Sequence, residues 1–299
     1  MNWVIFALLS RVLWAADNIV DKLLIGKYLK DPVVLTLTAG ISALFLSIAI
    51  IIFNGLEWIG FNPTALAIFA GAFQIVAVFA FYQAISKEEI SRVIPLFQFT
   101  PPFVLVFSFL FLGEVLTISY YFAFVLILVG GFLISLQKAE GVFKLRSAFW
   151  WMVLSSLIYA VQVVILKSLY VTYPFWDLTV YLGFGEFIPT PILLLLISNF
   201  RDRFTRNLSD LKPAGWTLLV LAMFFVATAS LSGFWALTSG PASLISVFRG
   251  FQSVFVLIYA VLFSIWLPKI LKEELSKSVL GIKAIAIFLM VIGLYLIYK

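Results

Sequence analysis

Apolar residues occur along the chain in ten runs of about twenty residues, and short polar segments separate these runs. A helix of this length crosses the roughly 30 Å hydrocarbon core of a bilayer, whereas the strands of a membrane barrel alternate over about ten residues. The pattern therefore predicts an all-α membrane protein with ten transmembrane helices. The predicted spans are Trp3–Ile25, Val33–Phe53, Thr64–Ser86, Ser91–Leu112, Ile118–Gln137, Ser147–Leu169, Trp176–Ser198, Ala214–Thr238, Leu244–Leu267 and Ser278–Tyr298.

Composition agrees with this pattern. The mean hydropathy is +1.14, and only 11% of the 299 residues are charged, against about 25% in soluble domains. Cysteine and histidine are both absent, which excludes disulfides and thiolate or imidazole metal sites. We expect no metal and no cofactor. The first span lacks a basic segment before it and contains Asp17 and Asp21, so we expect a retained helix and not a cleaved signal peptide.

The two halves of the sequence repeat. SRVLWAADNIVDKLL, from Ser10, lies over SSLIYAVQVVILKSL, from Ser155, which pairs Trp14 with Tyr159 and Asp17 with Gln162. Further on, FYQAIS lies over GFWALT, which makes Tyr82 and Trp235 near-equivalents, one residue apart in register. Each half has an odd number of spans, so the second copy runs through the membrane upside down. Two inverted five-helix repeats are expected, in residues 1–140 and 141–299, an architecture typical of secondary transporters.

The run from Ala84 through SRVIPLFQFTPPFVLVFSFLFLGEVLT to Gly130 and Gly131 resembles the drug/metabolite transporter superfamily, in its ten-helix EamA-like branch. The second half departs from this pattern, because Lys272 or Glu273 replaces the glycine before the glutamate, after an insertion. The resemblance implies transport of small metabolites by alternating access, often as export. It also implies a cavity lined by the first, third, fourth, sixth, eighth and ninth spans. The second and seventh spans would gate that cavity, and the apolar fifth and tenth would be peripheral.

Ionisable residues within spans are costly in a bilayer and are candidates for function. In the first span, Arg11, Asp17, Asn18 and Asp21 share one helical face with Trp14. One interpretation is an ion-pair network between Arg11 and Asp17 or Asp21 that fixes helix packing. The other gives Asp17 a role in substrate or proton binding.

A second polar stripe lies on the ninth span and contains Arg249 and Gln252. Arg249 could bind a carboxylate or phosphate as a bidentate fork, or it could pair with Glu186 of the seventh span. Glu186 stands in YLGFGEFIPTP, where glycines and prolines interrupt the helix pattern. It is therefore a candidate either for a coupling proton or for a partner of Arg249.

Two further groups of residues, a helix-end pair and four aromatic residues, have structural interpretations. Gly113 and Glu114 close the fourth span, where we expect capping and hydrogen bonding between spans. The aromatic residues at repeat-related positions predict an aromatic-lined cavity at the pseudo-twofold axis, with ordinary helix packing as the alternative. These residues are Trp14, Tyr82, Tyr159 and Trp235.

These features predict a secondary transporter, and more narrowly an exporter, of a small polar or amphipathic metabolite. A lipid-linked flippase or a multidrug exporter of the same fold is the alternative, and an intramembrane enzyme or a scaffold fits the sequence less well. The partners are then a small-molecule substrate and the lipid bilayer, with no nucleic acid. The loops after odd-numbered spans, counted with Lys22 and Arg92 at the adjoining span ends, carry 15 lysines and arginines, and the other side carries two, Lys167 and Lys299. Because positive loops stay in the cytoplasm, this bias predicts a cell-membrane protein with both termini outside; the resemblance implies termini in the cytoplasm.

Overall fold

The computed structural model describes residues 2–29, 31–85, 87, 93–135, 147–264 and 277–298, and every regular element in them is helical. Ser91, Glu88, Glu89, Lys272 and Glu273 lie outside these residues. The helices of the first half are α1 (Asn2–Lys27), α2 (Pro32–Asn54), α3 (Phe61–Ile85), the 3-10 helix η1 (Ile94–Phe99), α5 (Thr100–Leu112) and α6 (Ile118–Ser135). Those of the second half are α7 (Ser147–Thr172), α8 (Phe175–Phe187), α9 (Pro189–Leu196), α10 (Ser198–Ser209), α11 (Pro213–Ser239), α12 (Ala242–Val247), α13 (Arg249–Ser264) and α14 (Lys277–Tyr298).

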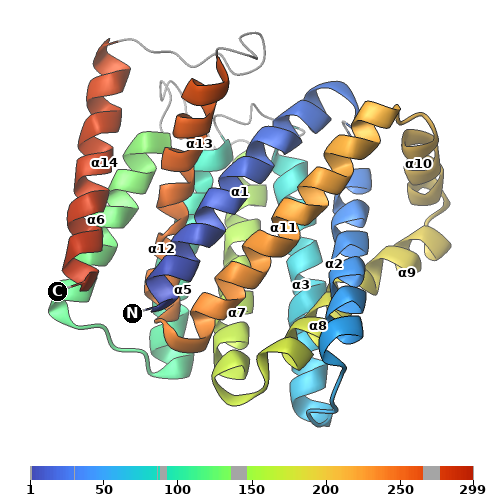
Figure 1. The fold of residues 1–299 in the computed structure, drawn as a ribbon, viewed down its shortest axis with the longest axis horizontal. Coiled ribbons are helices and arrows are strands. Elements are labelled where there is room, and N and C mark those ends of the chain that lie inside the picture. The colour runs from blue at the N-terminus through green and yellow to red at the C-terminus, as the bar shows by residue number, and fades with distance from the viewer. Residues whose placement is uncertain are drawn as a thin grey trace.

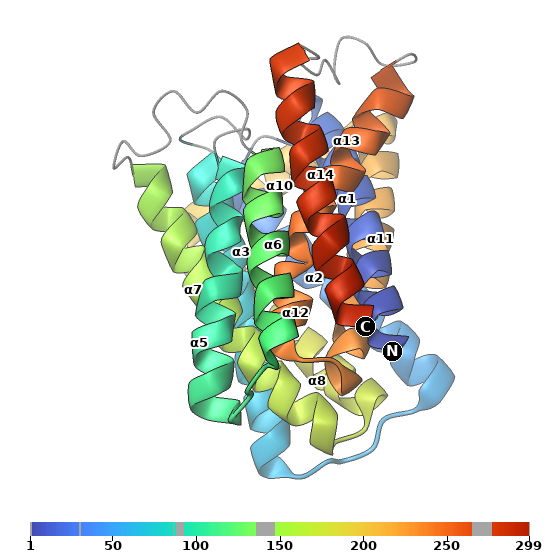
Figure 2. The same ribbon diagram turned by 90° about the vertical axis from the view of Figure 1, so that its left-hand side faces the viewer.

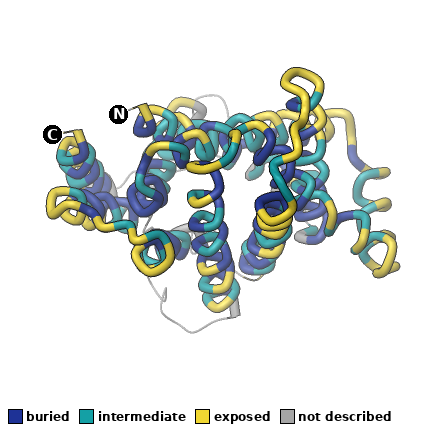
Figure 3. The backbone as a smooth tube through the Cα atoms, turned by 90° about the horizontal axis from the view of Figure 1, so that it is seen from below, coloured by how far each residue is buried: buried dark blue, intermediate teal, exposed yellow. Residues whose placement is uncertain are grey.

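Eight helical segments in the described part of the chain are long and apolar enough to cross a bilayer, and two shorter apolar helices cover Leu96–Leu112 and Ile118–Leu133. The chain is therefore a multi-pass membrane protein. Its long helices run side by side, and both termini lie at one end of the bundle, here called the terminal end (Figures 1 and 2). Seen along the bundle, exposed residues lie on the outer faces of the helices and buried residues between them (Figure 3).

Three predicted spans are interrupted. In the fourth, η1 contains Pro95 and gives way to α5, which begins with two prolines. In the seventh, α8 ends before Pro189, whose missing N–H cannot continue the helical ladder. In the ninth, α12 ends at Val247, Phe248 caps it, and α13 starts at Arg249. No proline or glycine precedes this third break, so the sequence pattern does not reveal it.

The helix α10 corrects the expectation of a plain connection between the seventh and eighth spans. Phe204 and Leu208 of α10 pack against a buried cluster that includes Leu29 and Leu211, while Arg201 stays exposed. Apolar residues four apart give the segment the helical period that the abundance of charged residues hides. Arg203 of α10 forms a fork on Asp31, with Nε–Oδ2 and Nη2–Oδ1 both at 2.6 Å, and Asp31 also caps α2 through the N–H of Val33 at 2.9 Å.

Helices from the two halves pack on each other in pairs. α1 packs along α11, and α3 along α7. The Ser10 hydroxyl donates to the Ala229 carbonyl oxygen at 2.8 Å, and the Ser155 hydroxyl donates to that of Ala77, also at 2.8 Å. Both serines are fully buried, so each bond links two helices inside the bundle.

The pair α6 and α14 crosses closely at glycines. A Cβ atom added at Gly130 would lie 2.7 Å from the Ala286 carbonyl oxygen and would overlap the Met290 side chain. A Cβ atom added at Gly293 would lie 2.6 Å from Ile127 Cγ1 and 3.0 Å from the carbonyl oxygen of Ala123. The contact between these two helices therefore depends on residues without a side chain.

Candidate functional site

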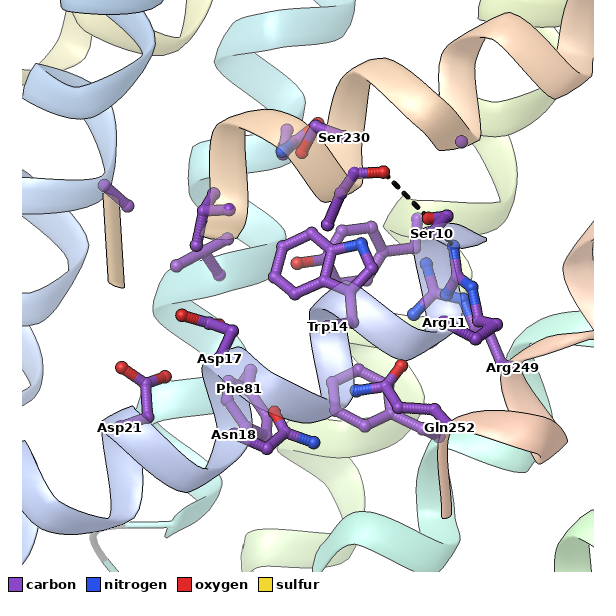
Figure 4. A pocket seen from close by; sticks show the side chains of 18 of the residues that line it. Ser10, Arg11, Trp14, Asp17, Asn18, Asp21, Phe81, Ser230, Arg249 and Gln252 are labelled. Atoms are coloured by element: carbon purple, nitrogen blue, oxygen red, sulfur yellow. Dashed lines mark hydrogen bonds between the residues drawn. The ribbon is translucent and has the colours of Figure 1, made fainter. Parts of the chain in front are cut away.

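A cavity of about 350 Å³ lies between the helices, within the roughly 300–1,000 Å³ of small-molecule sites. Its wall is formed by α1, α2, α3, η1, α7, α8, α11, α12, α13 and α14. Side chains of α1 project into it beside those of α11 and α13 (Figure 4). The second and seventh spans thus contribute wall residues directly, in addition to any gating role.

Nine of the ten residues proposed from the sequence for substrate or coupling line this cavity. They are Trp14, Asp17, Asn18, Tyr82, Tyr159, Gln162, Glu186, Arg249 and Gln252. Trp235 does not: it is 40% exposed and packs against the rings of Phe6 and Phe175. Successive residues of a helix are turned by about 100°, and the register match of Tyr82 is the preceding residue, Phe234, which does line the cavity.

The expected network between Arg11 and an acid of the same helix is not formed. Arg11 donates from Nη2 to the Ser10 hydroxyl at 2.9 Å, while its Nε and Asp17 Oδ1 are buried without a hydrogen-bond partner. Among the described residues, no ion pair joins Arg11 to Asp17 or Asp21. Ser10 directly precedes Arg11, whereas Asp17 and Asp21 lie about 9 Å and 15 Å further along α1, so the serine reaches the guanidinium and the acids do not.

Arg249 likewise has no ion pair with Glu186 in the described part of the structure. Its guanidinium carbon lies 4.9 Å from the ring centroid of Tyr159 and 5.7 Å from that of Phe97. Glu186 lies in the last turn of α8, on another wall of the cavity. The glycines that precede it stay helical, and the break falls after it, at Pro189.

Several wall residues escaped the sequence analysis. Gln74 of α3 hydrogen-bonds Gln162 of α7 across the cavity wall; its amide in an apolar span was the available signal. Lys283 is buried and lines the cavity, which corrects the expectation that the tenth span is wholly peripheral. A lysine near the start of an otherwise apolar span resembles an interfacial residue, so its direction could not be read from the sequence.

Glu114 joins the fourth span to the ninth. Its carboxylate accepts from the N–H of Ala242 at 2.8 Å, from the N–H of Ser243 at 3.1 Å, and from the Ser243 hydroxyl. These groups open α12, whose first N–H groups have no partner within the helix. Gly113 ends α5 in the left-handed conformation, with φ 64°, which turns the chain so that Glu114 reaches α12.

Aromatic rings pack together at the end of the cavity that faces the terminal end of the bundle. Tyr170 stacks on the wall residue Phe234 with ring centroids 5.7 Å apart, and Phe175 contacts both Tyr170 and Trp235. In the other direction the cavity reaches Leu24, Leu35 and Leu219, near the ends of α1, α2 and α11 that lie opposite the terminal end (Figure 1). Within the described residues no group of three or more acidic side chains is placed to hold a metal ion.

Comparison with known proteins agrees with this architecture. A search among curated proteins gives no match. A crystal structure of a protein is similar with a TM-score of 0.74 over 99% of this chain and 96% of its own, and at 16% identity it supports the fold alone. Residues 1–136 match the model of the EamA-like transporter family. This match covers less than half of the 299 residues, and it shows that the first half of the chain is similar to the EamA-like transporter family.

Proposed function

We propose that the chain is a secondary transporter that moves a small polar or amphipathic metabolite, in the direction of export, by alternating access between two inverted halves, residues 1–140 and 141–299. The observation that carries this proposal is the cavity itself, because helices of both halves enclose it and it holds Arg11, Asp17, Glu186 and Arg249, which form no ion pair with one another among the described residues. Such a site in a membrane bundle suits a solute that binds and leaves without covalent chemistry.

The paired hydrogen bonds between the halves support the inverted repeat. In the register that places Ser10 over Ser155 and FYQAIS over GFWALT, Ala77 lies over Ala229. The bond from Ser10 to Ala229 and the bond from Ser155 to Ala77 are therefore equivalent under exchange of the two halves. Reciprocal pairing of this kind is expected of two copies related by a twofold axis, and an odd number of spans in each half would place that axis in the membrane plane.

The crossing of α6 and α14 supports the same symmetry. Placing Gly130 over Gly293 also places Ala123 over Ala286 and Ile127 over Met290. Gly130 packs against Ala286 and Met290, while Gly293 packs against their counterparts. Counting η1, α5 and α6 as the fourth and fifth spans, we infer ten spans in two inverted sets of five.

Alternating access would result if the two halves exchanged conformations, so that the closed end of the cavity opened and the open end closed. In this proposal the aromatic rings around Phe234 form the closed gate at the terminal end, and the cavity extends toward the opposite end. The repeat counterpart of Phe234 is Tyr82, on the open side of the site. In the alternate conformation we expect Tyr82 and its neighbours to close and the rings around Phe234 to separate. Asp17 and Glu186 are the proposed coupling groups, since both are carboxylates in the cavity wall.

A flippase of the same fold is the second candidate. A small cavity of about 30 Å³ lies between α2, α8 and α11 and shares Glu186 and Phe234 with the main cavity. This volume has room for only one or two water molecules, so it does not admit an acyl chain. The conformation described here therefore favours a compact solute over a lipid-linked one.

A thermal-shift screen of the purified protein against metabolites, lipophilic cations and isoprenoid phosphates tests the proposal. A ligand well above its Kd raises the unfolding temperature because it binds only the folded state. We expect stabilisation by polar metabolites, and counterflow of those ligands in proteoliposomes. Stabilisation by isoprenoid phosphates alone would instead support the flippase.

A further inference from the structure

We propose that Arg11 and Arg249 together bind an anionic group of the transported solute, a carboxylate or a phosphate. This inference rests on the proposed transport function and specifies the class of solute. The two side chains come from α1 and α13, which pack on each other, and they lie next to each other at the cavity (Figure 4).

Arg11 is held with part of its guanidinium unused. The Ser10 hydroxyl accepts a hydrogen bond from Arg11 Nη2 at 2.9 Å and donates one to the Ala229 carbonyl oxygen at 2.8 Å. Because the hydroxyl hydrogen is used by Ala229, Ser10 can only accept from Arg11. The Nε–H has no hydrogen-bond partner, although Arg11 is only 9% exposed. On the facing helix, a Cβ atom at Gly233 would lie 3.0 Å from Ser10 Oγ. Because Gly233 has no side chain, there is room beside it for the Ser10 hydroxyl and the Arg11 guanidinium.

Arg249 contacts aromatic rings, and among the described residues it forms no ion pair with a carboxylate. Its guanidinium lies over the ring of Tyr159, at 4.9 Å, and beside Phe97. Stacking on a ring face leaves the N–H groups at the edge of the guanidinium plane free to form a bidentate contact with a planar anion. The break at Phe248, directly before Arg249, sets the direction in which α13 presents it.

The cavity also contains acids, but they lie elsewhere on its wall. Asp17 and Asp21 follow Arg11 along α1 by about 9 Å and 15 Å of helix rise, and Glu186 belongs to α8. Within the described residues none of the three forms an ion pair with either arginine. Lys283 of α14 adds another cation to the wall and has interactions of its own. Two neighbouring guanidinium groups inside a membrane protein repel each other, and a bound anion removes this repulsion.

The other residues of the cavity wall indicate what kind of surface the rest of the solute has. Trp14, Phe81 and Tyr82 line the cavity between the arginines and its open side. Rings of this kind bind apolar or aromatic surface. A compact organic acid or phosphate monoester with an apolar body fits this arrangement, whereas a lipophilic cation would place its charge against two others of the same sign.

Binding of matched probes to the purified full-length protein tests the inference. Benzoate and phenyl phosphate carry the anion, benzamide is the neutral isostere of benzoate, and benzylammonium carries the opposite charge. We expect the two anions to raise the unfolding temperature at concentrations at which benzamide and benzylammonium have no effect. Arg11→Gln and Arg249→Gln should each weaken anion binding about tenfold or more, while Arg201→Gln, on the exposed face of α10, should leave it unchanged.

The comparison among probes on the unmodified protein does not depend on the folding of any variant. Equal effects of benzoate and benzamide, or an effect of benzylammonium alone, would overturn the proposal. Anion binding that survives in both glutamine variants would place the anion elsewhere and would also overturn it. Transport is measured separately, as counterflow in proteoliposomes. An anion that binds through the arginines but shows no counterflow would contradict the transport proposal alone. Counterflow restricted to neutral or cationic solutes would contradict the anion site alone.

Discussion

The hydroxyl of Ser10 on α1 donates a 2.8 Å hydrogen bond to the carbonyl oxygen of Ala229 on α11. The counterpart of Ser10, Ser155 on α7, donates an equivalent bond to Ala77 on α3. Each bond fastens one half of the chain to the other beside the cavity. They differ in one respect: only the Ser10 hydroxyl also accepts from an arginine. The symmetric pair thus has a structural role in both halves and an added role in orienting Arg11 in one.

Replacing these serines separates the two roles. Ser155→Ala should lower the free energy of unfolding by about 0.6–1 kcal/mol, the range for one buried hydrogen bond in a membrane bundle, without affecting anion binding. Ser10→Ala should cause a similar loss and should also weaken anion binding, because Arg11 loses its only protein acceptor in the described structure. Ser168→Ala is the control, since this exposed hydroxyl bonds only within its own helix. Equal anion binding in the two buried variants would contradict the role assigned to Ser10.

The glycines of α6 and α14 give a test of the inverted repeat. Gly130→Ala and Gly293→Ala should destabilise the protein by similar amounts, about 1–3 kcal/mol, because each new methyl group overlaps the facing helix. Gly281→Ala, near the start of α14, has nothing within 4 Å of the added atom and should be neutral or slightly stabilising. The measurement is thermal unfolding in detergent. A large loss at one crossing glycine with none at the other would mean that the two crossings are not equivalent.

The fork between Arg203 and Asp31 ties α10 to the start of α2. Arg203→Gln should lower the stability by about 1 kcal/mol, a value reduced from that of a buried pair because the arginine side chain is 37% exposed. Arg201→Gln should have no measurable effect, since its contact with Asp202 is long, at 3.9 Å, and exposed. A double-mutant cycle with Asp31→Asn isolates the pair, and a coupling energy near zero would show that the fork contributes nothing.

If a proton gradient drives transport, a carboxylate in the cavity must gain and lose a proton as access switches. Asp17→Asn and Glu186→Gln remove this capacity from the two proposed coupling groups while keeping their shape. We expect at least one of them to abolish gradient-driven uptake in proteoliposomes and to spare exchange of solute across the membrane. Full gradient-driven uptake in the double variant would exclude both residues from coupling.

The sequence predicted the positions of most helices well, because the free-energy cost of placing polar groups in lipid requires long apolar runs wherever a helix crosses the membrane. It predicted nine cavity residues because charged or aromatic side chains in spans are few and the helical period fixes their faces. It failed at Trp235, where a shift of one residue turns a side chain by about 100°. It also missed α10 and Lys283, since packing against distant residues decides both. The ion-pair interpretations of Arg11 and Arg249 are not met among the described residues. Asp17 and Asp21 lie too far from Arg11 along α1, and the sequence does not give the relative heights of Arg249 and Glu186 on their separate helices.

Orientation remains a prediction from charge. The loops after odd-numbered spans, together with the adjoining span ends, carry 15 lysines and arginines, and the side of the termini carries two, so we expect the termini outside the cytoplasm. A C-terminal fusion to alkaline phosphatase, which is active only outside the cytoplasm, should be active. An inactive phosphatase together with an active cytoplasmic reporter at the same position would reverse the assignment.

The central claim is that one cavity is open alternately to the two sides of the membrane, and labelling of a single cysteine tests it most directly. The chain has no cysteine, so Ser246→Cys, in the cavity wall beside Arg249, introduces the one reactive thiol. A membrane-impermeant maleimide should label it from the side opposite the termini in the absence of solute. During solute exchange, the maleimide should also label this cysteine from the terminal side. Labelling from one side under every condition, while solute is transported, would contradict alternating access through this cavity.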